Sequence, residues 1–436
     1  MRKVLFALLA VSLFWASCKK DDDIAQVFTV TVQLVYPTAG NFAAQEGVTV
    51  KLTSSSNSYE AKTDASGKAS FAVPIGVYET SATDARSENG RSYVYNGVKS
   101  GIAVSTTGIG SDVVTLDLTE SQRSQIIIKE LFVGGTPKDD NSGAFAFDKY
   151  VILYNNSDAP ASLNNLCIGM IAPYNAQATN SYYVGGVLSY ESENWTPAGQ
   201  GFWYFQQNLT IEPGKQIVVA INNAVNNTLT YSKSINFDNA SYYAMYDIAK
   251  FPNASYYVSP SASIPTNHYL NSEVYGMGNA WSISVTSPGL FLFTTGDKTP
   301  SAFAGDATST SQITSYVSKK VPNTWIVDAV EAYLLNNTSN KKRFTAAVDA
   351  GYVYHVNNQG YSIYRNVDKE ATEAITANTG KLVYNYQFGT TSVGGSTDAS
   401  AIDAEASIKA GARIVYKDNN NSTTDFHLRS QASLRN

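Results

Sequence analysis

Short stretches in which apolar and polar residues alternate constrain this chain more than any other feature. Residues 27–36 read VFTVTVQLVY, and residues 47–52 read GVTVKL. A period of two with many β-branched residues predicts strands that each bury one face. Turn-forming residues separate such stretches, as in DASG at residues 64–67 and PIG at residues 74–76. Many short strands joined by turns predict an all-β protein.

Composition agrees with this fold class and bounds the partners. Charged residues make up 15% of the chain, well below the usual quarter, and 29 Tyr supply part of the polar surface. The net charge is −5 without a basic cluster, which argues against a nucleic-acid partner. A chain of 436 residues is long enough for two hydrophobic cores. We therefore predict two domains, residues 27–118 and residues 119–436.

Three segments of the first domain carry a resemblance to a known module. They are GVTVKL at residues 47–52, TDASGKASF at residues 63–71 and PIGVY at residues 74–78. Their order resembles the Cna-B and carboxypeptidase-regulatory type of prealbumin-like module, which implies a β-sandwich that serves as a stalk or spacer. Some of these modules form a Lys–Asn isopeptide bond between the first and last strands. Residues 27–36 contain no Lys and residues 113–118 contain no Asn, so we expect no cross-link.

The second domain begins with a different pattern. Residues 125–133 (QIIIKELFV) and residues 148–158 (DKYVILYNNSD) predict strands, and the second of these ends in an Asn-rich turn. Residues 209–220 (LTIEPGKQIVVA) place Pro213 and Gly214 at the two centres of a predicted type II turn. This stretch resembles a lamin-tail domain, which implies an Ig-like β-sandwich.

Later segments extend the lamin-tail resemblance and show that the domain is enlarged. Residues 325–331 resemble a later strand of that family, and residues 418–426 its closing segment. The matching pieces are widely spaced, so we expect insertions, chiefly within residues 171–208 and residues 223–320. The best helix signal is residues 399–410. The whole arrangement resembles an uncharacterised Bacteroidota surface-lipoprotein family, which implies a fold and a location but no activity.

The N-terminus predicts export. A basic start is followed by a short apolar core and by the small residues Ala16 and Ser17, which together predict a signal peptide over residues 1–17. Cys18 follows at once, so the segment resembles a bacterial lipoprotein signal, which implies cleavage before Cys18 and lipid attached to it. The lipoprotein pattern usually has Leu where this chain has Trp15. The alternative is an ordinary secretory signal with a chance cysteine.

A charged segment follows the predicted lipid site. Residues 19–23 read KKDDD within a predicted tether over residues 18–26. A Lys and acidic cluster in this place resembles the surface-export signal of Bacteroidota lipoproteins, although short charge runs also serve simply as solvated tethers. We expect an outer-membrane location, anchored by lipid and facing the extracellular side.

No pattern for metal, cofactor or nucleophilic chemistry stands out. The three histidines, His268, His355 and His427, are far apart and lack metal-ligand spacing. Cys167 is the one cysteine left if Cys18 carries lipid, and its neighbours Leu166 and Ile168 predict a buried small side chain. We predict no catalytic residue, no metal site and no cofactor.

The acidic residues are predicted to have structural roles rather than to bind metal or catalyse a reaction. Residues 139–143 (DDNSG) resemble a calcium loop, but the bidentate Glu is missing and Asp148 stands five residues past the Gly, so a plain turn is favoured. Asp328 and Glu331 are three apart on a predicted strand and should face opposite sides, which argues against a glycosidase pair. Asp418 is expected to make local turn hydrogen bonds.

Aromatic residues crowd residues 171–260, and two explanations remain open. Aromatics on strands usually pack in a core, whereas Tyr and Trp beside amides also suit flat sugar rings. If this segment carries a ligand surface, the candidate binding residues are Trp195, Trp203 and Tyr204.

These observations favour a non-enzymatic, lipid-anchored binding or interaction protein. Its partner would be a glycan, or a TonB-dependent transporter whose cargo it helps to capture. The alternatives are a surface hydrolase that acts on polysaccharide or phosphoester, and a purely structural adhesion component.

Overall fold

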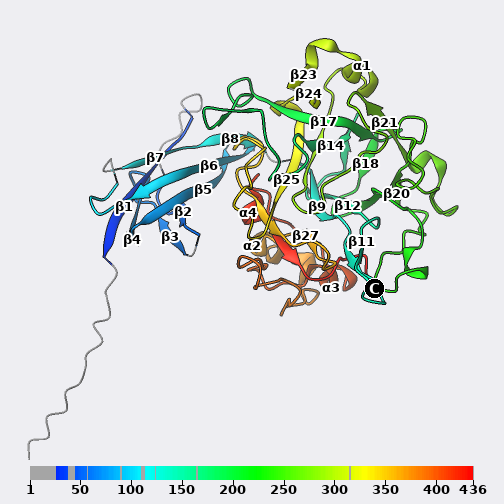
Figure 1. The fold of residues 1–436 in the computed structure, drawn as a ribbon. Helices are drawn as coiled ribbons and strands as arrows, with labels where there is room; N and C mark the ends of the chain where they lie inside the picture. Colours follow the sequence, from blue (N-terminus) through cyan, green and yellow to red (C-terminus); the bar gives the residue numbers. More distant parts are fainter. Residues whose placement is uncertain are drawn as a thin grey trace, which may run out of the picture.

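The computed structural model of this chain describes residues 26–37, 45–55, 57–88, 91–109, 113–122, 124–163, 165–313 and 316–435. The predicted signal peptide and Cys18 lie outside these ranges. The described chain forms two units, drawn blue to cyan and cyan to red in Figure 1. Strands are the main regular secondary structure of both, so the predicted all-β fold class is confirmed. None of the helices in the described ranges combines the length and the apolar character needed to cross a bilayer.

The first unit consists of two small sheets. Its strands are β1 (Val27–Val35), β2 (Thr49–Thr53), β3 (Ser58–Lys62), β4 (Lys68–Pro74), β5 (Gly76–Glu88), β6 (Arg91–Val104), β7 (Val114–Asp117) and β8 (Thr119–Gln122). One sheet has the order β4-β1-β7 and the other the order β3-β2-β5-β6-β8. Every second residue of β1 points inward, with Val30, Val32 and Leu34 buried, as alternation predicts. Because β8 pairs with β6, the second sheet continues past residue 118, where the predicted first domain ends.

The second unit is built on one long sheet. Its larger strands are β9 (Ile126–Phe132), β12 (Tyr150–Asn155), β14 (Cys167–Ile171), β17 (Trp195–Tyr204), β19 (Gln216–Ala220), β20 (Tyr243–Met245), β21 (Tyr269–Val274), β22 (Gly289–Phe293), β24 (Tyr316–Pro322), β25 (Ile326–Leu334), β26 (Val353–His355), β27 (Ser362–Arg365) and β28 (Phe426–Arg429). The sheet order is β26-β25-β22-β14-β17-β21-β20-β19-β12-β9-β27-β28, and β24 pairs with β17. The sheet bends round its core, so that β25 packs against β9 and β26 against β28.

Shorter elements complete this unit. They are β10 (Thr136–Pro137), β11 (Ala144–Phe145), β13 (Ala161–Leu163), β15 (Tyr183–Val184), β16 (Val187–Leu188), β18 (Leu209–Ile211), β23 (Thr310–Ile313), α1 (Pro300–Gly305), α2 (Lys369–Glu373), α3 (Ala404–Lys409) and α4 (Ser422–Asp425). The helix expected within residues 399–410 is α3, which starts late because the Asp403 side chain accepts a hydrogen bond from the Ala406 amide and caps it. Gly214 has a φ of 69°, as the predicted type II turn requires.

The segments expected as insertions are part of the main sheet. Residues 171–208 contribute β17, and residues 223–320 contribute β21 and β22, which lie in the middle of the strand order. Aromatic side chains in these segments therefore pack in the hydrophobic core of the second unit. The main core contains Trp203, Phe251 and Trp281 among its buried residues.

Candidate functional site

A cleft lies between the two units and is the candidate site. Three adjoining hollows of about 320, 380 and 740 Å³ form it. Lys51 and Asn421 line the first two, and Tyr352 and Tyr354 line the first and third, so the hollows are continuous. The first unit contributes outward-facing residues of β2, β5 and β6. The second unit contributes residues from the segments 350–354, 393–397 and 417–424.

Four tyrosines line the hollow of about 740 Å³, and we call them the tyrosine cluster: Tyr183, Tyr333, Tyr352 and Tyr354. The rings of Tyr333 and Tyr352 are stacked, with centroids 3.9 Å apart and planes 12° apart. The ring of Tyr354 meets that of Tyr352 edge-on at 5.5 Å. Tyr352 and Tyr354 are half-buried.

Two glycines make room for this arrangement. A Cβ on Gly394 would lie 2.7 Å from Cδ2 of Tyr354, and the φ of Gly394 is 60°, so this position favours glycine twice over. A Cβ on Gly351 would lie 2.0 Å from Oδ1 of Asn421. Neither position has room for a Cβ. The two glycines therefore allow Tyr354 and Asn421 to lie close to the backbone.

The wall from the first unit is polar. Ser81, Ser100 and Glu79 line it, and the Ser100 hydroxyl donates a hydrogen bond of 2.6 Å to Glu79 Oε2. Lys51 pairs at 2.8 Å with Glu60 on the neighbouring strand. This wall therefore presents hydroxyl groups to the cleft, and the charges of Glu79 and Lys51 have partners within the first unit.

Buried charges support the cleft from below. Glu331 on β25 is fully buried and accepts hydrogen bonds from Arg343, from Nε at 2.8 Å and from the backbone amide at 3.0 Å. Lys342 Nζ lies 2.7 Å from the other Glu331 oxygen and reaches the cleft lining. Burial raises the pKa of Glu331, but Lys342 and Arg343 outweigh it and hold that pKa below its usual value.

Asp349 is the second carboxyl beneath the cleft. Its oxygens accept hydrogen bonds from the Ser422 amide at 2.7 Å and from the Ser422 hydroxyl at 2.6 Å. Burial raises its pKa to about 6, although Lys342, 3.9 Å away, acts in the opposite direction. Asp349 thus ties the start of α4 to the segment that carries Tyr352.

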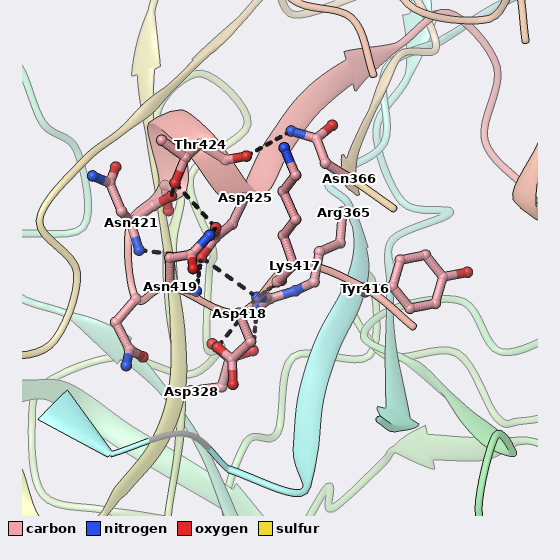
Figure 2. Close-up of polar contacts among 12 residues, drawn as sticks. Asp328, Arg365, Asn366, Tyr416, Lys417, Asp418, Asn419, Asn421, Thr424 and Asp425 are labelled. Carbon is pink, nitrogen blue, oxygen red and sulfur yellow. Dashed lines mark hydrogen bonds and ion pairs between the residues drawn. The ribbon is translucent and has the colours of Figure 1, made fainter. Parts of the chain in front are cut away.

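Arg365 fixes the Asn-rich loop of residues 417–424, which forms the other side of the cleft (Figure 2). Its guanidinium donates to Asp328 and contacts Asp418 and Asp425 at 3.6 and 3.8 Å. Its Nε also donates to the Ile128 carbonyl at 2.7 Å, so the side chain holds the loop against β9 and β25. The backbone amide of Asn419 donates to Asp425 at 2.7 Å, which shapes the loop from within.

The same loop contacts the first unit. The Asn96 side-chain amide, fully buried on β6, donates to the carbonyls of Asn419 and Asn420. The Asn421 side chain donates to the Thr83 hydroxyl at 3.1 Å. The loop held by Arg365 therefore sets the position of the first unit across the cleft.

The residues predicted as ligand contacts lie elsewhere. Trp203 is 0% exposed, and its ring stacks on Phe251 with centroids 5.3 Å apart. Trp195 is 8% exposed, and its indole N–H donates to Glu193 at 2.8 Å. Tyr204 is partly exposed and bonds to Glu273 at 3.4 Å. These positions correct the expected picture: a ring stacked in the core, as Trp203 is, has no free face for a sugar, and none of the three lines the cleft.

Other acidic residues and Cys167 can be compared with their predictions. Residues 139–143 form a turn in which the Ser142 amide donates to Asp140 at 2.9 Å. In the described ranges, no three His, Cys, Asp or Glu side chains gather in a way that could hold a metal ion. Cys167 is buried, as expected. Asp418 does more than the local turn bonding predicted for it, because it is buried and pairs with Arg365.

The histidines serve the packing of the second unit. His355 and His427 are buried, and burial lowers their pKa values to about 4 and about 3. His268 stacks on Tyr243 with ring centroids 4.2 Å apart.

The sequence patterns do not predict the tyrosine cluster. Tyr183 lies in the aromatic-rich segment, but Tyr352 and Tyr354 lie outside it, in the sequence GYVYH of residues 351–355. Tyrosines two apart on a strand point to the same side, and this spacing was the available signal.

The fold and the cleft define an all-β protein of two units with a polar and aromatic groove between them. A family model described as "Protein of unknown function (DUF4876)" matches residues 212–385, which include three residues of the tyrosine cluster. The match covers fewer than half of the residues, so it identifies a DUF4876 region in this chain. The prealbumin-like and lamin-tail-like resemblances remain predictions.

Solved structures support the fold. A DUF4876 family protein from Bacteroides thetaiotaomicron is 19% identical, with 92% of this chain and 94% of that chain covered and a TM-score of 0.51. This likeness concerns the fold alone. A DUF3823 family protein from Parabacteroides merdae is 11% identical over 43% of this chain and 97% of that chain, and its TM-score of 0.15 supports no conclusion. No curated protein matches the chain.

Proposed function

We propose that this chain is a lipid-anchored cell-surface binding protein that captures a glycan in the cleft between its two units and passes it to a TonB-dependent transporter. The observation that carries the proposal is the cleft itself, in which half-buried tyrosines face serine and asparagine side chains of both units. Its three continuous hollows suit an extended ligand.

Sugar rings match this lining chemically. The flat apolar face of a sugar stacks on an aromatic ring, and its hydroxyls exchange hydrogen bonds with amide and hydroxyl groups. Each aromatic contact contributes about 0.5–1.5 kcal/mol. Two such contacts, at Tyr352 and Tyr354, with several hydrogen bonds would give the weak, reversible binding that cargo transfer requires.

The sequence before residue 27 supports the location. Cys18 follows a signal-like segment, and the KKDDD of residues 19–23 resembles a surface-export signal. A single acyl chain holds a protein only marginally, so stable anchoring requires the several chains of a bacterial lipoprotein.

A binding screen tests the cleft. The full chain carrying Cys18→Ala, which lacks the lipid site, would be titrated with neutral and acidic oligosaccharides by calorimetry. Tyr354→Ala should weaken binding several-fold. Tyr384→Ala is the matched control, because this tyrosine is 44% exposed and does not line the cleft.

Two outcomes would contradict the proposal: no oligosaccharide binds, or binding survives Tyr354→Ala unchanged. New reducing ends in the mixture would instead favour the hydrolase alternative. Co-purification with a TonB-dependent transporter from membranes, dependent on Cys18, tests the partner.

A further inference from the structure

An exposed apolar group stands at one end of the first unit. Val27, Ile75 and Val77 have 55%, 52% and 67% of their surface exposed, and we call them the apolar tip. Val27 pairs with Pro74 at the end of β4, and Ile75 lies in the turn between β4 and β5. Val77 is the second residue of β5, so the three side chains share one end of the sandwich.

Two stretches of sequence that flank the apolar tip contain no charged residue. Residues 69–78, which form β4 and the start of β5, have no Asp, Glu, Lys or Arg. The same holds for residues 100–109, which include Ala103, the partner of Val77 across β5 and β6. Charged side chains are costly to bring into a bilayer, whereas aliphatic ones gain by entering it. This end of the unit therefore suits a lipid surface.

The predicted anchor precedes this same end in sequence. β1 begins at Val27, which belongs to the apolar tip. Val27 follows Cys18 by nine residues in sequence. Nine extended residues reach at most about 30 Å, so lipid on Cys18 would keep the apolar tip within that distance of the bilayer.

We propose that the apolar tip inserts among the lipid headgroups of the membrane to which the chain is anchored. The proposal rests on the proposed lipid anchor at Cys18. Three aliphatic side chains would not hold a free protein on a membrane. A short tether raises their effective concentration at the surface, so a weak contact is sufficient.

This contact would orient the cleft. Ser81 and Thr83 line the cleft and lie four and six residues beyond Val77 on β5. At about 3.3 Å per residue, the cleft wall stands about 13–20 Å farther from the membrane than the apolar tip. The docked unit therefore holds the cleft clear of the headgroups.

A fluorescent probe on the lipidated full chain tests the proposal. Ile75→Cys would be labelled with an environment-sensitive dye on chains bound to vesicles of phosphatidylethanolamine and phosphatidylglycerol; Cys167 is buried and should not react. We expect a blue-shifted emission and quenching by spin-labelled headgroups. Met277→Cys is the control, because Met277 is 81% exposed in the second unit and should show neither change.

A second variant separates the apolar tip from the anchor. Val77→Asp should abolish quenching of a probe at residue 75 while the chain still floats with the vesicles. If the wild-type chain floats, and the probe on the Ile75→Cys variant behaves like the probe on the Met277→Cys variant, the apolar tip proposal is wrong and the anchor proposal stands. If the wild-type chain does not float, the anchor and the apolar tip proposal both fail.

Discussion

The two units bury different chemistry, although both are made of strands. The core of the first unit is apolar and follows the alternation of its strands, as in Val30 and Val32 of β1. Among the side chains described there, Asp84 is the one buried acidic or basic residue, and the Tyr36 hydroxyl donates to it at 2.6 Å. The second unit buries many charged side chains, including Arg343 and Arg365.

This difference teaches how each unit responds to change. An apolar core loses stability in proportion to the atoms removed. A buried ion pair loses more when one partner goes, because the other is left charged and unpaired. All four described tryptophans, Trp195, Trp203, Trp281 and Trp325, lie in the second unit, so tryptophan fluorescence follows that unit separately.

The largest effect is expected from Arg365→Met. Removing the guanidinium leaves Asp328, Asp418 and Asp425 buried without it, which should lower the unfolding free energy of the second unit by about 3–5 kcal/mol. Urea denaturation followed by tryptophan fluorescence measures the change. Arg413→Met is the control, because its partner Asp158 is 90% exposed and the loss should stay below about 1 kcal/mol. Equal losses would show that burial of the pair is unimportant.

Leu52→Ala should have the next largest effect, in the first unit. Leu52 is 0% exposed on β2, and truncating a buried leucine costs about 2–5 kcal/mol. Hydrogen exchange of peptides from β1 to β7 should rise while the tryptophan transition stays in place. If the tryptophan transition also moved to lower urea, the two units would unfold together. Their different cores would then not give them separate stabilities.

Acid should weaken the second unit through its buried histidines. The folded pKa values of His355 and His427 are about 4 and about 3, below the value of about 6.5 expected in the unfolded chain. Between these values the unfolded state binds more protons, so stability falls as pH falls from 6.5. Each histidine should cost about 2 kcal/mol between pH 7 and pH 5.

Asp349 works in the opposite direction, because its folded pKa is raised to about 6 and its protonation below that pH favours the folded state. His355→Gln should therefore flatten the measured decline, and Asp349→Asn should steepen it. Urea denaturation at pH 7, 6 and 5 checks both slopes. A decline of the same size in the first unit, whose described residues include no histidine, would contradict the assignment.

The smallest effect is expected where the units meet. Asn96→Ala removes a buried amide that donates to the Asn419 carbonyl, which should cost about 1 kcal/mol and loosen the first unit against the loop. Small-angle X-ray scattering should show a broader distribution of shapes. Ser70→Ala, which removes an exposed bond to Thr31, should leave the scattering unchanged.

The sequence predicted the strands of the first unit best, and its failures have physical causes. The alternation of residues 27–36 predicts β1 to within a residue, because one face of that strand is buried and the other is not. The alternation does not predict β6, because Asn96 and Gly97 interrupt its pattern. A Cβ on Gly97 would lie 2.8 Å from the Asp117 carbonyl, so close packing, rather than strand propensity, selects the glycine.

The site was harder to predict, for reasons of topology. β9 is buried along its whole length, including Lys129 and Glu130. Charged residues are usually exposed, so the sequence does not predict their burial. Trp203 was a ligand candidate because of its neighbours, but β17 lies in the middle of the sheet order and buries it. Tyr183 and Tyr352 line the same hollow although 169 residues separate them in sequence, and only the fold brings them there.

The pairing of β1 with β7 has a mechanical consequence. β1 leads back towards the predicted anchor, β7 leads on to the second unit, and the two strands run parallel from Val32↔Val114 to Val35↔Asp117. A pull between an anchored N-terminus and a ligand held by the second unit would slide these strands along each other. Their hydrogen bonds then share the load and must break together, whereas a peeled pair breaks one bond at a time. If the chain is anchored at its N-terminus, the β1–β7 pair would thus resist unfolding when a bound ligand pulls on the second unit.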